Sequence, residues 1–165
     1  MWGGLMPIHP DFSYFRYMNA FVHTLLLADD DSDDCIFFKD ALEDLPVSVN
    51  LITVNDGVEL MRTLSSNTQQ LPDILFLDLN MPRKTGFECL SEIKENKQLK
   101  HLPIIILSTS LDMKVVSSLH DMGAHYYIRK PGEFGQLKKL IHEAILITTQ
   151  KNPEQPAKEN FILGP

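Results

Sequence analysis

The sequence predicts an α/β domain in which helices cover both faces of a parallel sheet. Five short apolar runs recur between residues 24 and 147, and the gaps between them carry apolar residues at helical spacing. Three of the runs are almost continuous in apolar residues, as is expected of strands buried on both faces. Strands that alternate with helices in this way form βα units with right-handed crossovers.

The predicted strands share a high content of Leu, Ile, Val and aromatic residues. They span residues 24–28 (TLLLA), 48–54 (SVNLITV), 73–77 (DILFL), 103–107 (PIIIL) and 125–129 (HYYIR). Each strand is followed by a helix, and the apolar faces of the helices comprise Cys35, Phe38, Leu42 and Leu45; Leu60 and Leu64; Phe87, Leu90 and Ile93; Val115, Leu119 and Met122; and Leu137, Leu140, Ile141 and Ala144. Capping chemistry predicts helix starts at Ser32, at Asn55 or Asp56, and at Thr85, and a helix end at Gly123.

Five βα units predict a doubly wound, flavodoxin-like (βα)5 sheet with the strand order 2-1-3-4-5. In such a sheet, ligands bind at the carboxyl ends of the strands, beside the switch point between the first and third strands. We therefore expect the functional residues directly after Ala28, Leu77, Leu107 and Arg129.

Composition narrows the class of protein. The chain has 165 residues, enough for about one domain, and a net charge of −7 with Lys and Arg interspersed among acids. This balance argues against a nucleic-acid partner. No apolar run approaches the roughly 20 residues of a membrane helix. The two cysteines, Cys35 and Cys89, have no spacing typical of a metal or disulfide site, so we expect a reduced, cytoplasmic protein.

Three regions differ in character along the chain. Residues 1–23 are irregular and aromatic, and the sequence leaves open whether they form an arm or whether Met18 is the true start. Residues 24–147 form the predicted domain. Residues 148–165 contain three prolines, and we expect a flexible tail whose apolar end, Phe161-Ile162-Leu163, is free rather than docked.

Polar and charged side chains stand at every strand end where function is expected. Asp29 and Asp30 follow the first strand, Asp78 the third, Ser108 the fourth and Lys130 the fifth. Three carboxylates at adjacent strand ends repel one another, and a hard divalent cation such as Mg²⁺ relieves that repulsion. Asp78 is then suited to attack a phosphoryl group whose charge the metal and the lysine balance.

The motifs LLLADDD, LFLDLNMPRKTG, PIIILSTS and HYYIRKP occur in this order over residues 24–147. In this combination the chain resembles the receiver domain of two-component response regulators, and the Ser-Thr-Ser string is similar to that of stand-alone regulators that partner phytochromes. The resemblance implies that Asp78 is the phosphorylated residue. It also implies that Asp29 and Asp30 form the acidic pair, with Asp30 a direct metal ligand, and that Asn80 offers its main-chain carbonyl to the metal.

The resemblance assigns a switching role to residues of the last two strands. Ser108 matches the switch hydroxyl, Lys130 the lysine that contacts the phosphoryl group, and Tyr127 the aromatic that turns inward on activation. The Lys130–Pro131 bond is expected to be cis, against the trans preference of about 0.5–1 kcal/mol for X–Pro bonds. Asp31, Asp33 and Asp34 are interpreted as loop and first-turn acids favoured by the helix dipole.

Two positions depart from the family pattern. Gly132 stands where Phe often follows the Lys–Pro pair, and Thr109 replaces a commonly smaller residue after the switch hydroxyl. The sequence does not fix how either change affects the rates of phosphorylation and dephosphorylation.

The function implied is that of a phosphoacceptor switch rather than an enzyme, with Mg²⁺ as its metal and no organic cofactor. Its expected partners are a histidine kinase or phosphotransfer protein, a downstream protein and a second copy of the chain, with no nucleic acid or membrane. Too few residues follow the last helix for a separate output domain, so output is expected through the face of the fourth helix, fifth strand and fifth helix. A phosphatase that turns over an aspartyl intermediate would need an acid where Asn80 stands, and a pseudo-receiver would lack the acidic pair or the acceptor.

Overall fold

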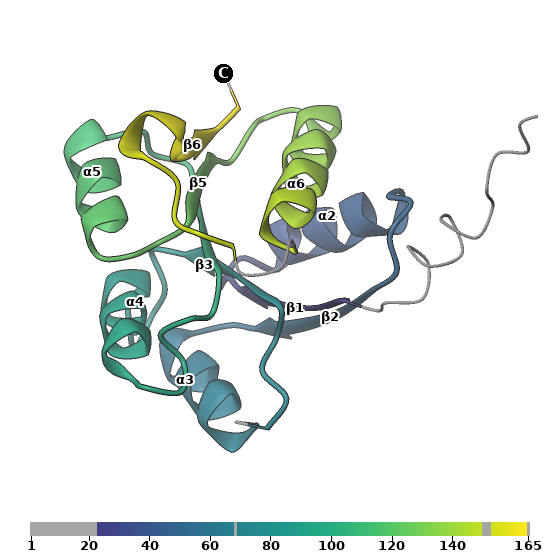
Figure 1. Cartoon of the computed structure of the whole chain (residues 1–165). Helices are drawn as coiled ribbons and strands as arrows, with labels where there is room; N and C mark the ends of the chain where they lie inside the picture. The colour runs from purple at the N-terminus through teal and green to yellow at the C-terminus, as the bar shows by residue number, and fades with distance from the viewer. Residues whose placement is uncertain (1–22, 68, 150–152, 165) are drawn as a thin grey trace, which may run out of the picture.

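The computed structural model describes residues 23–67, 69–149 and 153–164, so the predicted arm lies almost entirely outside the described residues. A six-stranded, wholly parallel sheet forms the centre, in the order β2-β1-β3-β4-β5-β6 (Figure 1). The strands are β1 (His23–Ala28), β2 (Val49–Val54), β3 (Ile74–Asp78), β4 (Ile104–Ser108), β5 (Tyr126–Arg129) and β6 (Ile162–Leu163). The predicted fold class and the order of the first five strands are confirmed, and β6 is an addition that was not predicted.

The helices form two layers, one on each face of the sheet (Figure 1). They are α2 (Ser32–Glu43), α3 (Gly57–Ser66), α4 (Gly86–Glu95), α5 (Met113–Asp121) and α6 (Phe134–Thr148), and a short 3-10 helix, η1 (Lys158–Asn160), follows. Side chains of α2 and α6 pack on one face, and those of α3, α4 and α5 on the other. Within β1 the two faces alternate by residue, with Leu25 and Leu27 facing α2 and α6, and Leu26 facing the other layer. Among the described residues, no helix is both long and apolar enough to cross a membrane.

Side-chain caps fix where four of the helices begin, including α5, where Asp112 accepts from the N–H groups of Lys114 and Val115. Asp31, one residue before the predicted Ser32, caps α2 by accepting from the N–H groups of Asp33 and Asp34. Asp56, rather than Asn55, caps α3. Thr85 forms a reciprocal capping box at α4. These caps place the N-terminus of α2 just after the acidic end of β1, and that of α4 at the end of the loop that follows Asp78.

The prediction of a free apolar end in the tail is wrong. Helix α6 runs to Thr148, and Ile162 and Leu163 pair with Tyr127 and Ile128 of β5. The physical reason is burial: Phe161 is 1% exposed, and its carbonyl oxygen satisfies the edge N–H of Tyr127 at 2.9 Å. An apolar triplet is too short to carry a period, so the sequence did not reveal this strand.

Candidate functional site

The parallel register brings the polar strand ends to one edge of the sheet. Ala28 lies opposite Leu77, Asp78 opposite Leu107, and Ser108 opposite Arg129. Asp78 and Ser108 are the last residues of their strands, whereas Asp29 and Lys130 come directly after theirs. The structure therefore gathers the predicted site residues at the expected place.

Asp29, Asp30 and Asp78 form a compact cluster of carboxylates. Each offers an oxygen atom, and the three oxygens lie within 4.8 Å of one another. Asp29 and Asp78 are buried and Asp30 is exposed, so the cluster is open to solvent on one side. Three carboxylates with an open side fit a hard cation such as Mg²⁺, which keeps waters among its ligands.

Lys130 joins three carboxylates at this edge. Its ammonium group donates to Asp29 Oδ2 at 2.8 Å and to Asp34 Oδ2 at 2.7 Å, and lies 3.8 Å from Asp78 Oδ1. Asp34 is the site residue that the sequence analysis missed, because it was interpreted only as a first-turn acid. The sequence places Asp34 in the first turn of a helix that starts beside the acidic strand end, but this position does not distinguish it from Asp33.

The electrostatics of the cluster follow from burial and crowding. Burial raises the pKa of Asp78 to about 6; the charges of Asp29 and Asp30 add to the rise, and Lys130 opposes it. Burial also raises the pKa of Asp29, against the hydrogen bond from Lys130. Burial alone would lower the pKa of Lys130, but its hydrogen bonds to Asp29 and Asp34 raise it above the ordinary value. The site therefore holds excess negative charge that a bound cation would stabilise.

Ser108 connects the acidic edge to Tyr127. Ser108 is buried, and its hydroxyl oxygen accepts from the N–H of Ser110 at 3.3 Å. Tyr127 is fully buried, and its hydroxyl donates to the carbonyl oxygen of Ser110. The predicted switch aromatic thus already points into the core and reaches the turn that follows Ser108.

The Lys130–Pro131 bond is not cis, since the described residues contain no cis peptide bond, and that prediction is wrong. The trans form agrees with the ordinary preference of an X–Pro bond, about 0.5–1 kcal/mol. The N–H of Lys130 donates to the carbonyl oxygen of Ser108 at 2.8 Å, and this bond holds the end of β5 against β4.

The loop after Asp78 approaches the first turn of α4 closely. A Cβ at Gly86 would lie 2.3 Å from the carbonyl oxygen of Asp78, so only glycine fits there. Asn80 and Thr109 are both exposed. The proposed use of the Asn80 carbonyl as a metal ligand stays a prediction.

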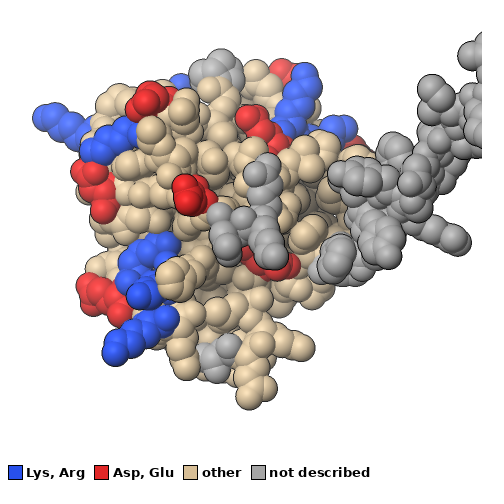
Figure 2. Space-filling view, in the orientation of Figure 1, with Lys and Arg blue, Asp and Glu red and all other residues tan. Residues whose placement is uncertain are grey.

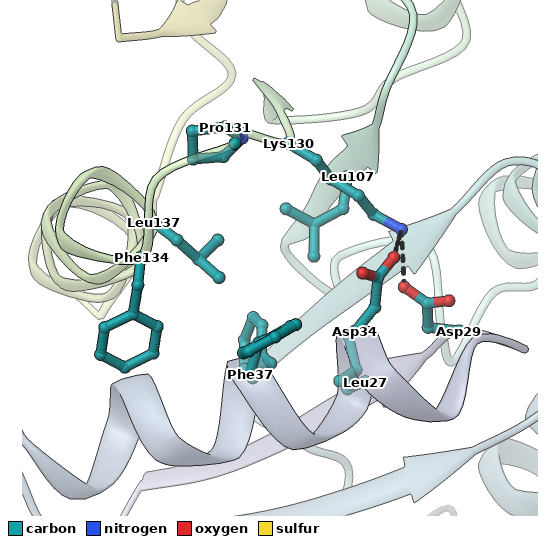
Figure 3. A pocket seen from close by; sticks show the side chains of 11 residues that line it. Leu27, Asp29, Asp34, Phe37, Leu107, Lys130, Pro131, Phe134 and Leu137 are labelled. Atoms are coloured by element: carbon teal, nitrogen blue, oxygen red, sulfur yellow. Dashed lines mark hydrogen bonds and ion pairs between the residues drawn. The ribbon is translucent and has the colours of Figure 1, made fainter.

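A pocket of about 310 Å³ opens beside the cluster, between α2 and α6 (Figure 3). Lys130, Asp29 and Asp34 lie at one end, and apolar side chains line the rest, among them Leu27, Phe37, Leu107, Phe134 and Leu137. A Cβ at Gly132 would meet no atom within 4 Å. The departure from the family pattern at Gly132 therefore leaves the mouth of this pocket open.

Comparisons with known proteins agree with this arrangement. Residues 25–142 match the family model of the response regulator receiver domain. Response regulator Rcp1 of Synechocystis is 30% identical over 121 residues, covering 71% of this chain and 82% of Rcp1. A probable methanogenesis regulatory protein, FilR2 of Methanothrix harundinacea, is 27% identical over 122 residues, covering 72% of this chain and 79% of FilR2.

Solved structures show the same likeness. The phosphorylated cyanobacterial phytochrome response regulator RcpA is 31% identical with a TM-score of 0.72, over 81% of this chain and all (100%) of RcpA. The Mn²⁺-bound form of Rcp1 is 27% identical with a TM-score of 0.70, over 82% of this chain and 99% of Rcp1. With the fold, the clustered carboxylates and the family match in agreement, the chain belongs to the response regulator receiver domain family.

Proposed function

We propose that this protein is a single-domain response regulator that accepts a phosphoryl group on Asp78 from a histidine kinase or phosphotransfer protein, with Mg²⁺, and signals through protein–protein contacts. One observation carries the proposal. The Asp78 carboxylate stands in a cluster with Asp29 and Asp30 and lies 3.8 Å from the Lys130 ammonium. A nucleophile flanked by a cation site and a fixed positive charge is what phosphoryl transfer requires.

The transfer balances as a simple displacement. A carboxylate oxygen of Asp78 forms a bond to phosphorus, and the bond from phosphorus to the donor nitrogen or oxygen breaks, leaving its electron pair on the donor. Lys130 compensates the charge that the phosphoryl oxygens bring into a buried site. Mg²⁺ held by Asp29, Asp30, Asp78 and the Asn80 carbonyl would neutralise further charge on those oxygens.

Ser108 and Tyr127 are proposed to couple phosphorylation of Asp78 to a change in conformation. The Ser108 hydroxyl is buried at the end of β4, next to Asp78 on β3, and can donate to a phosphoryl oxygen. Its displacement would move the turn that holds Ser110, to which the Tyr127 hydroxyl donates. Phosphorylation would then act as a local charge change that biases a two-state loop.

The alternative of a turnover phosphatase lacks its acid, because the place two residues after Asp78 holds Asn80. A pseudo-receiver is disfavoured because both members of the acidic pair and the acceptor are present.

Phytochrome response regulators among the similar structures support a histidine kinase as the donor. On the face that Figure 2 draws, Lys and Arg lie beside Asp and Glu, which supports protein partners, including a second copy, over nucleic acid or a membrane surface.

The test is incubation of the purified protein with a small phosphodonor and Mg²⁺, followed by intact-mass measurement. We expect a gain of one phosphoryl group in wild type and none in Asp78→Asn. Asp40→Asn, which changes an exposed aspartate on α2, is the matched control and should keep the gain. A gain that survives in Asp78→Asn would overturn the acceptor assignment, and a gain unaffected by chelation would overturn the metal requirement.

A further inference from the structure

The C-terminal segment 153–164 lies across the β5 edge of the sheet and along α5 (Figure 1). Ile162 and Leu163 add a two-residue parallel strand to β5. The N–H of Tyr127 donates to the carbonyl oxygen of Phe161 at 2.9 Å. The segment thus closes a strand edge that would otherwise present unpaired main-chain groups.

Side chains hold the segment at both of its ends. The Gln155 amide donates to the carbonyl oxygens of His120 and Ala124, at 2.6 and 2.7 Å, where α5 ends. Lys158 lies 2.6 Å from the Asp121 carboxylate. The ring of Phe161 packs edge-on against His120 with centroids 5.1 Å apart, and its centroid lies 6.4 Å from that of Tyr127.

These contacts are weak enough for the segment to leave β5 and α5 while the rest of the domain stays folded. Its strand is two residues long, its ion pair is exposed, and Phe161 is its largest buried side chain. Exposed ion pairs contribute little, and segments with few buried apolar contacts open at low free energy. Phe161 and Leu163 each join one of the two core clusters, but all other buried members of both clusters come from residues 25–145.

A continuous chain of contacts runs from the acceptor to this segment. Ser108 ends the strand beside Asp78, its hydroxyl accepts from Ser110, Ser110 accepts from Tyr127, and Tyr127 contacts Phe161 through both ring and main chain. We infer that segment 153–164 is a latch whose docking on β5 and α5 is coupled to phosphorylation of Asp78, an inference that rests on the proposed function.

The direction of coupling follows from these contacts. When Ser108 turns towards a phosphoryl group, the turn containing Ser110 moves with it. The Tyr127 hydroxyl then either loses the Ser110 carbonyl oxygen as its acceptor or moves together with that oxygen. Phe161 packs between the rings of His120 and Tyr127, so a shift of Tyr127 removes one of these two contacts, weakens the docking of the latch and favours its opening, which frees the N–H of Tyr127. Binding free energies are reciprocal, so a protein with a weakened latch must favour the phosphoryl-bound state.

The first test is hydrogen exchange of the full chain, with and without phosphorylation, read by mass spectrometry of peptides. Peptides covering 126–129 and 158–164 should exchange at least about tenfold faster after phosphorylation, while those covering β1 and β3 should not change. Equal exchange in both states, in protein shown by mass to be phosphorylated, would overturn the latch and leave the proposed function standing. Absence of any phosphoryl gain would overturn the proposed function and the coupling together.

The second test measures the affinity for beryllofluoride, a phosphoryl mimic, in the presence of Mg²⁺. Phe161→Ala should bind it at least about fivefold more tightly than wild type, the lower end of usual coupling. If Phe161→Ala fails to fold, Gln155→Ala takes its place, because it changes only an exposed side chain. It should give a smaller change in affinity of the same sign. Leu146→Ala, an exposed apolar residue on α6, is the control and should not differ from wild type. Unchanged affinity in a folded variant whose 126–129 peptide has lost protection would overturn the coupling.

Discussion

Two edges of the same sheet differ in how they are held together. At the carboxyl edge, Lys130 and the carboxylates of Asp29, Asp34 and Asp78 form a largely buried charge network. At the β5 edge, a two-residue strand and Phe161 attach the last segment of the chain. The first depends on Lys130, the one cation among these four side chains, whose removal would leave buried carboxylates uncompensated. The second is a local contact that can open alone, which suits it to respond to the first.

The largest effect is expected from Lys130→Ala. Asp29 is 1% exposed, and removal of its cation leaves buried carboxylates unpaired, so the free energy of unfolding should fall by about 3–5 kcal/mol. Urea unfolding at pH 7 measures it. Lys138→Ala breaks only a surface pair with Asp44, at 3.3 Å, and is the control, with about 0–1 kcal/mol expected. Equal losses in the two variants would contradict the difference between buried and exposed pairs.

A pH-dependent effect of opposite sign is expected from Asp78→Asn. The pKa of Asp78 rises from 3.8 to about 6 in the fold, so ionisation destabilises the folded state as pH rises through this interval. Asn mimics the protonated form, and the variant should be more stable than wild type by about 3 kcal/mol at pH 7. The two proteins should converge below about pH 4, where both are neutral at this position. Thermal unfolding across pH 4 to 8 measures the difference, and a constant difference across this range would contradict it.

Addition of Mg²⁺ gives a second test of the charge repulsion at Asp78. Mg²⁺ should stabilise wild type at pH 7, because it offsets the repulsion among Asp29, Asp30 and Asp78. The gain in melting temperature should be smaller in Asp78→Asn, which removes one charged ligand. Chelation should reverse the gain in wild type. An equal gain in both proteins would place the metal elsewhere.

An intermediate effect is expected from Phe161→Ala. Full removal of a buried Phe side chain usually costs about 3–5 kcal/mol, and Phe76→Ala in β3 should cost that much because β3 cannot detach. Phe161 is equally buried, at 1% exposed, but its segment can leave the sheet, so the loss is limited to about 1–2 kcal/mol. Urea unfolding of both variants provides the measurement. A loss at Phe161 as large as that at Phe76 would show that the segment is part of the cooperative core.

The smallest effect is expected from Gly132→Phe. A Cβ there meets no atom within 4 Å, and the residue is not among the glycines with positive φ. The change in stability should stay within about 0.5 kcal/mol, as for other surface substitutions. Gly86→Ala is the opposing control, because its Cβ would lie 2.3 Å from the Asp78 carbonyl oxygen. Thermal unfolding separates the two, and a large loss in Gly132→Phe would mean that the pocket mouth is not open in solution.

Much of the fold and the position of the site could be predicted from local patterns. Buried parallel strands have apolar sequences, and the switch-point rule predicts that Asp29, Asp78, Ser108 and Lys130 lie at one edge of the sheet, where the structure has them. Asp34 could not be predicted, because which first-turn acid faces Lys130 depends on the rotation of α2 about its axis. The docking of Phe161 depends on a surface made by α5 and β5, more than thirty residues earlier in the chain.

The sequence by itself determined the order of the five main strands and the charged residues at their ends, because burial on both faces and strand-end chemistry are written in local residue choice. Only the tertiary structure decided the sixth strand and the partner of Lys130 on α2. Each of these depends on small differences in free energy between a segment and a distant surface, and no local pattern records that surface.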